Sequence, residues 1–348
     1  MEYINSLSSD VIDIDISSTD LFRLPDLSRF TCLQRLYCDD NFLEQLDNLP
    51  DSLIFLSCSN NQLTRLDNLP SSLQILNCPR NQITQLDNLP FSLQQLICYN
   101  NQITQLNNLP DSLIFLSCNG NQLTRLDNLP SSLQILNCYG NQLKQLDNLS
   151  HSLQKLDCSH NRLTQLDNLP FFLQELNCSW NQITQLDKLP SSLHLLNCHG
   201  NQLTQLDNLP STLQTLYCSW NQITQLNKLP YSLQILSCQW NQITQLDYLP
   251  SSLIKLICYQ NQIAQLDNLP SSLYQLDCSK NKMENIDIEY WKERTKNIKL
   301  LKEKISVRKI QKIWRKYWYD FYKYEMIDGK YIGFCRFIER SYYILCDC

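Results

Sequence analysis

Apolar residues recur along this chain with a strict period of 20. One unit, residues 73–92, reads LQILNCPRNQITQLDNLPFS and carries Leu73, Leu76, Cys78 and Ile83 at its apolar positions. Asparagine recurs at the same period from Asn41 to Asn281, and a cysteine stands three positions before each one. The spacing L-x-x-L-x-C-x-x-N-x-I is neither a pure helical nor a pure strand period. It predicts a coil that turns once per repeat, through thirteen repeats.

The alternation around Leu76 and Cys78 predicts a short strand with both side chains inward, while Ile75, Asn77 and Pro79 point outward. Successive copies would pair into a parallel sheet at about 4.8 Å per step, which gives a rod on the order of 60 Å long. A proline in the second half of the repeat, as at Pro50, fixes φ and removes a backbone donor. The return side of each coil is therefore expected to be extended or turn-like, without a helix.

The repeat resembles the leucine-rich repeat family, whose signature is L-x-x-L-x-L-x-x-N-x-L with cysteine allowed in apolar positions. Its second half, L-D-N-L-P-x-S, resembles the short 20-residue class found in secreted bacterial effectors of the YopM and IpaH type. The near-identity of the units also resembles repeat proteins of giant amoeba viruses. The resemblance implies a solenoid with a parallel β-sheet on its concave face and an extended or turn-like convex side. It also implies a role in binding proteins.

Three regions are expected. Residues 1–32 form an N-terminal cap with one divergent repeat, in which Ile14 and Ile16 correspond to Leu36 and Cys38. Residues 33–286 hold thirteen repeats, the last one degenerate. Residues 287–348 are a basic C-terminal cap or tail, α-helical or α+β. Residues 291–348 contain 15 Lys and Arg against 7 Asp and Glu, whereas the rest of the chain contains 14 against 27.

Composition argues against most enzyme classes. Five glycines leave no Gly-rich phosphate loop, and four histidines offer little for a metal cluster or a His-dependent active site. We therefore expect no enzyme activity, no cofactor and no metal. Thirteen of the 17 cysteines fall in one inward column, where parallel strands hold them too far apart for disulfides. Buried, reduced thiols indicate an intracellular, cytoplasmic site, which is the host cytoplasm if the chain is viral. No apolar run reaches the length that a membrane-spanning helix needs, so no transmembrane segment is expected.

The asparagine column is interpreted as structural, because its amides can bond backbone groups of neighbouring turns. An aspartate column, as at Asp47, is replaced by Asn107 and Asn227, which favours a turn-capping acceptor over a cation-binding ladder. The outward strand columns vary between repeats, so a binding site would lie there. The candidate partner-binding residues are aromatic: Trp180, Trp220, Trp240, Tyr99, Tyr139, Tyr259, Phe55 and Phe115. The alternative is that these side chains merely cover the sheet.

These observations favour a non-enzymatic, monomeric scaffold that binds a protein partner on its concave face. An alternative is an adaptor whose basic tail binds a calmodulin-like protein or an acidic surface, because VRKIQKIWRKYWY resembles an incomplete IQ motif with Ile310, Gln311 and Arg315 in place. Nucleic acid is a less favoured partner. A ubiquitin-ligase effector is disfavoured, since the segment after the repeats is too short for that family's catalytic domain and Cys346-Asp347-Cys348 does not fit its Cys-x-Asp motif.

Overall fold

The computed structural model describes residues 4, 6–266 and 269–283. The chain divides into two compact units, Met1–Glu284 and Asn285–Cys348. The described residues belong to the first unit, and the predicted helical tail lies outside them.

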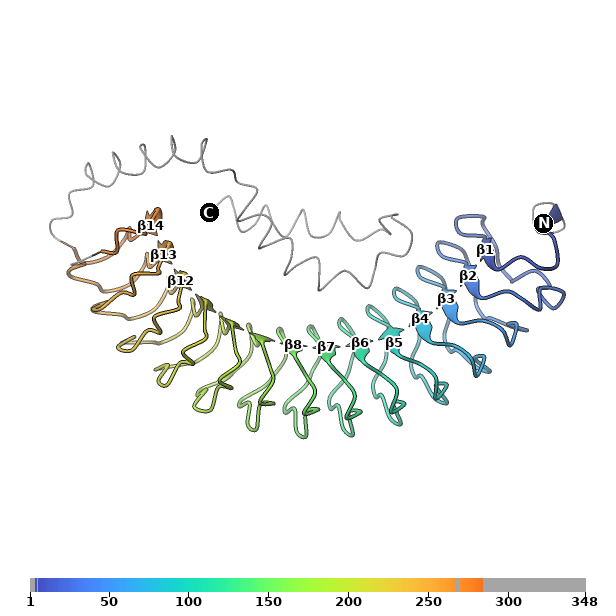
Figure 1. Ribbon diagram of the computed structural model, residues 1–348, viewed down its shortest axis with the longest axis horizontal. Coiled ribbons are helices and arrows are strands. Elements are labelled where there is room, and N and C mark those ends of the chain that lie inside the picture. The colour runs from blue at the N-terminus through green and yellow to red at the C-terminus, as the bar shows by residue number, and fades with distance from the viewer. Residues whose placement is uncertain (1–3, 5, 267–268, 284–348) are drawn as a thin grey trace. The chain divides into compact units, whose positions relative to one another are not determined.

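Fourteen short strands form one parallel sheet in chain order, and they line the inner curve of the solenoid (Figure 1). Each strand pairs with its counterpart in the next repeat, as Leu196 does with Leu216. The predicted parallel sheet of a leucine-rich repeat solenoid is confirmed. The strands are β1 (Asp13–Asp15), β2 (Arg35–Tyr37), β3 (Phe55–Ser57), β4 (Ile75–Asn77), β5 (Gln95–Ile97), β6 (Phe115–Ser117), β7 (Ile135–Asn137), β8 (Lys155–Asp157), β9 (Glu175–Asn177), β10 (Leu195–Asn197), β11 (Thr215–Tyr217), β12 (Ile235–Ser237), β13 (Lys255–Ile257) and β14 (Gln275–Asp277).

The core is a stack of near-identical layers inside the coils. Leu73, Leu76, Cys78 and Ile83 of one repeat have no exposed surface, and the strands of the neighbouring repeats stack on either side in register. Burying each leucine contributes about 1.5–3 kcal/mol, so every coil depends on its two neighbours to exclude water.

The return side of the coil is built from turns. Between β1 and β14 the described residues contain no helix, which confirms the prediction from the prolines. Each proline opens a tight turn, in which the Leu53 amide donates to the Pro50 carbonyl at 3.1 Å. Ser150 replaces proline in one repeat, yet Leu153 still donates to its carbonyl at 3.1 Å.

The asparagine column ties adjacent coils together. Asn121 Nδ2 donates to the carbonyls of Cys118, at 3.0 Å, and of Cys98 in the preceding repeat, also at 3.0 Å. Its Oδ1 accepts from the Ile103 amide at 3.0 Å. The same bonds recur along the column, which confirms its structural role. These carbonyls and amides are buried, so the side chain replaces the water that they lost.

The divergent first repeat uses a different side chain for the same purpose. Ile14 of β1 pairs with Leu36, as the sequence alignment predicts. Thr19 stands where Asn41 stands in the next repeat, and its hydroxyl donates to the Ile16 carbonyl at 2.6 Å. The first coil thus keeps the hydrogen bond that closes this turn, made by a shorter side chain.

Candidate interaction surface

The first and third residues of each strand lie on the inner curve, where the predicted outward columns stand side by side. Three predicted site residues on or next to these strands are buried: Phe55 (7% exposed), Phe115 (8%) and Tyr99 (7%). Their expected exposure is therefore wrong. Parallel strands lie about 4.8 Å apart, so side chains of adjacent repeats cover one another. Phe55, for example, packs against Tyr37 with ring centroids 4.9 Å apart. Tyr139 and Tyr259 are half-buried.

The three predicted tryptophans remain accessible. Trp180 and Trp220 are each 47% exposed, and Trp240 is 39% exposed. They do not lie on the strands but shortly after the ends of β9, β11 and β12, in the turn that leads away from the sheet. Trp220 and Trp240 stack with ring centroids 4.6 Å apart and ring planes 23° apart.

The turn that carries these tryptophans is left-handed. Their φ angles are 53°, 55° and 56°, in a region where a Cβ atom is crowded and glycine or asparagine is favoured. Other repeats place Asn60, Asn100 or Gly120 at the same position, and Arg80, His160, Gln260 and Lys280 adopt the same conformation there. A non-glycine side chain in this conformation costs about 1–2 kcal/mol, and the turn recurs in every repeat from Asp40 to Lys280, so it is a property of the coil.

Trp180 lies across the neighbouring glycine. A Cβ atom added to Gly200, which has a φ of +65°, would stand 2.9 Å from Cδ2 and Cε3 of the Trp180 ring, so the ring lies where only a glycine leaves it space. The ring also meets His199 edge-on, with centroids 5.1 Å apart, and stacks against His160 at 5.8 Å. Burial, with a smaller effect of His160, lowers the pKa of His199 and keeps its ring neutral near pH 7.

The segments that carry the tryptophans are uncharged. Residues 177–185, 197–205, 217–225 and 237–245 contain no Asp, Glu, Lys or Arg. The three preceding repeats carry Arg125, Lys144, Asp157 and Arg162 in the same segments. The polar side chains next to each tryptophan in the sequence are therefore uncharged amides and hydroxyls.

Charged groups mark the middle of the inner curve. Lys155 Nζ and Glu175 Oε1 lie 3.0 Å apart on β8 and β9. Asp157 accepts from the Ser159 hydroxyl at 2.6 Å and from Asn177 Nδ2 at 3.0 Å. Burial raises the pKa of Asp157 despite these bonds. Along the chain, this polar group separates the buried aromatic side chains of the first repeats from the tryptophans.

Asp39, near the N-terminal end, is a second buried carboxylate. It accepts from the Ser57 hydroxyl at 2.7 Å and from the Ser59 amide, and burial raises its pKa. The Asp39 carboxyl therefore holds its proton more tightly in the folded protein than in the unfolded chain. As the pH rises from the pKa of Asp39 in the unfolded chain through its pKa in the folded protein, ionisation of Asp39 destabilises the fold.

Replacing Asp39 by asparagine should therefore stabilise the protein at pH 7, because a neutral amide keeps an acceptor for Ser57 without the cost of a buried charge. The gain in urea midpoint over the parent should shrink at pH 3, where Asp39 is protonated. Asp51→Asn removes a different, exposed carboxylate and serves as the control. An equal gain at both pH values would contradict the assignment.

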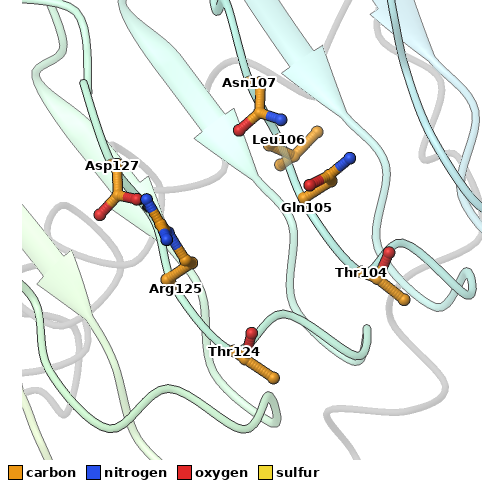
Figure 2. A pocket seen from close by; sticks show the side chains of 7 residues that line it. All are labelled: Thr104, Gln105, Leu106, Asn107, Thr124, Arg125 and Asp127. Atoms are coloured by element: carbon orange, nitrogen blue, oxygen red, sulfur yellow. Dashed lines mark hydrogen bonds and ion pairs between the residues drawn. The ribbon is translucent and has the colours of Figure 1, made fainter.

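A polar pocket lies between two return turns, lined by Thr104, Gln105, Leu106, Asn107, Thr124, Arg125 and Asp127 (Figure 2). Arg125 forms an ion pair with Asp127 on its rim. Elsewhere in the aspartate column, Asp47 accepts from Gln45 Nε2 at 2.6 Å. These contacts are made by exposed side chains and differ from the turn-capping bonds that we expected.

The cysteine column has little chemistry of its own. Every repeat cysteine from Cys38 to Cys258 is buried and carries a free thiol. Burial raises the pKa of Cys118 and Cys178 to about 12, so their thiols stay protonated and unreactive. In the part of the chain that the structure describes, no group of three or more His, Cys, Asp or Glu side chains could hold a metal ion.

The tail residues Ile310, Gln311 and Arg315 lie outside the described residues. Within those residues, no helix has the length and apolar character needed to cross a bilayer.

Solved structures with the same fold include two YopM proteins. YopM from Yersinia enterocolitica is 31% identical, with a TM-score of 0.65 over 79% of this chain and 75% of its own. YopM from Yersinia pestis, a leucine-rich effector protein, is also 31% identical, with a TM-score of 0.69 over 79% of this chain and 84% of its own. The functional domain of InlJ from Listeria monocytogenes, which includes a cysteine ladder, is 25% identical, with a TM-score of 0.62 over 81% of this chain and 66% of its own.

No protein-family profile and no curated protein sequence matches the chain. The likeness to YopM extends over most of both chains, and it covers repeats whose strands form the parallel inner sheet. The chain belongs to the leucine-rich repeat proteins.

Proposed function

We propose that this protein is a non-enzymatic scaffold that binds a protein partner with the inner curve of its solenoid and the adjoining tryptophan turns. The observation that carries the proposal is the position of Trp180, Trp220 and Trp240. Each is a large aromatic side chain, 39–47% exposed, in a left-handed turn that the other repeats fill with asparagine, glycine or a polar or charged side chain. Tryptophan is among the residues most enriched in the energetic centres of protein interfaces.

Further support comes from the fold's relatives and from the cysteines. The Yersinia pestis YopM is named as a leucine-rich effector protein, and a role in binding other proteins is in keeping with that name. A column of buried, free thiols suits a reducing compartment, so we place the scaffold's partner inside a cell.

The test is partner capture with three forms of the full chain. In the first variant, Trp180, Trp220 and Trp240 are replaced by asparagine, which suits the left-handed turn and preserves folding. In the control variant, Phe91 and Tyr231, each 91% exposed on the return side, are replaced by the serine found there in other repeats. The tryptophan variant should lose a cross-linked partner that the parent and control retain. Equal capture by all three forms would reject this surface.

A further inference from the structure

The tryptophan turns and their surroundings form one continuous strip along four repeats. The strip consists of Trp180, Gly200, Trp220 and Trp240 in the left-handed turns, His199 beside them, and the exposed amides of Gln182, Gln202, Gln222 and Gln242 slightly further along each coil. We call it the Trp strip. Its aromatic rings and amides recur at the spacing of the repeats, so an extended ligand could contact several of them in turn.

We propose that the Trp strip binds an uncharged, proline-rich segment of the partner in the polyproline II conformation. The inference rests on the proposed scaffold function and names the chemistry that the scaffold recognises. Three properties carry it: the spacing of the tryptophans, the absence of acidic and basic side chains from their segments, and the hydrogen-bonding groups at the strip.

The spacing of the strip matches the period of the ligand. Polyproline II has three residues per turn and rises about 3.1 Å per residue, so its side chains return to one face about every 9.3 Å. Neighbouring repeats lie about 4.8 Å apart, so the turns of Trp180 and Trp220, two repeats apart, lie about 9.6 Å apart. Prolines one helical turn apart would therefore lie over these two turns, with the Trp180 ring leaning over Gly200 between them.

The absence of charged side chains from the strip favours a neutral partner. The segments around its tryptophans contain no Asp, Glu, Lys or Arg, and burial keeps His199 uncharged near pH 7. A charged segment placed here would lose hydration and gain no counter-ion, which is costly. Single-stranded nucleic acid, which also stacks on aromatic rings, needs a positively charged groove to follow its phosphates.

The hydrogen-bonding groups complete the match. A polyproline II segment has no internal hydrogen bonds, so its carbonyl groups need outside donors. Indole Nε1–H groups and glutamine amides are such donors. A partner strand could not add to the sheet here, because β9 to β12 are paired with neighbouring strands on both sides. Aromatic surfaces with donors are the established way to bind proline-rich segments.

Binding of a ten-residue oligoproline, acetylated and amidated so that it carries no charge, tests the proposal by calorimetry on the full chain. The parent should bind it and should not bind a blocked Gly-Ser peptide of the same length. Trp180→Asn should weaken binding about 10-fold, as expected for loss of one central aromatic contact. The triple tryptophan-to-asparagine variant should abolish it.

Gly200→Ala provides a test that retains every tryptophan. The added Cβ would stand 2.9 Å from the Trp180 ring and must displace it, so binding should weaken as it does in Trp180→Asn. The Phe91→Ser, Tyr231→Ser variant, altered on the return side, should bind like the parent. Urea unfolding of each variant confirms that it is folded.

Three outcomes would overturn the polyproline assignment: failure of the parent to bind oligoproline, binding that is unchanged in the triple variant, or tighter binding of a neutral sugar. Tighter binding of a neutral oligosaccharide of similar length would assign the strip to sugars instead. If oligoproline fails while partner capture still requires the tryptophans, the polyproline assignment is wrong and the scaffold function stands. If capture is also independent of the tryptophans, both are wrong.

Discussion

Replacing Asn121 by alanine is expected to lower the free energy of unfolding by about 3 kcal/mol or more, a large effect for one side chain. The change removes bonds from Nδ2 to the carbonyls of Cys98 and Cys118, and from the Ile103 amide to Oδ1. These backbone groups stay buried, and each one left without a partner costs about 1–3 kcal/mol. The urea midpoint measured by circular dichroism reports the loss.

Gln122→Ala is the matched control, because Gln122 follows Asn121 directly and its side chain is exposed. It should change stability by less than about 0.5 kcal/mol. Asn121→Asp should be worse than Asn121→Ala at pH 7, since a buried carboxylate cannot donate to carbonyls and repels them. Similar midpoints for Asn121→Ala and Gln122→Ala would show that the column does not hold the coils together.

The second large effect is expected in the core. Leu216 is the central residue of β11 and has no exposed surface, so Leu216→Ala should cost about 2–5 kcal/mol through lost burial and a residual cavity. Its counterpart Leu276 is the central residue of β14, the last described strand, and is only partly buried. Leu276→Ala should cost clearly less.

The comparison tests whether each coil depends on both neighbours. Leu216 is covered by Leu196 on one side and Leu236 on the other, whereas the strand pairing described for Leu276 is with Leu256 alone. Amide hydrogen exchange should therefore accelerate through the middle repeats in Leu216→Ala and only near β14 in Leu276→Ala. Equal losses at both positions would mean that the solenoid unfolds without regard to repeat position.

Much of this molecule could be predicted from one repeat. The spacing of Leu76, Cys78 and Asn81 predicts the strand, the inward cysteine and the structural amide, and repetition turns each into a column. The left-handed turns were not anticipated, because Trp180 and Arg80 occupy positions where glycine or asparagine would have signalled a positive φ. The signal was present in other repeats, where Asn60, Asn100 and Gly120 occupy the same position, but the bulky residues obscured it.

Sequence alone determined the period, the parallel sheet, the helix-free return side and the inward cysteine column, because each follows from spacing within a single repeat. Only the tertiary structure decided which aromatic side chains a partner can reach. Phe55 and Tyr99 were both predicted to be exposed, yet they are buried, while Trp180 is half exposed. The physical reason is that exposure depends on side chains one repeat away in the sequence, which the coil brings to within about 5 Å.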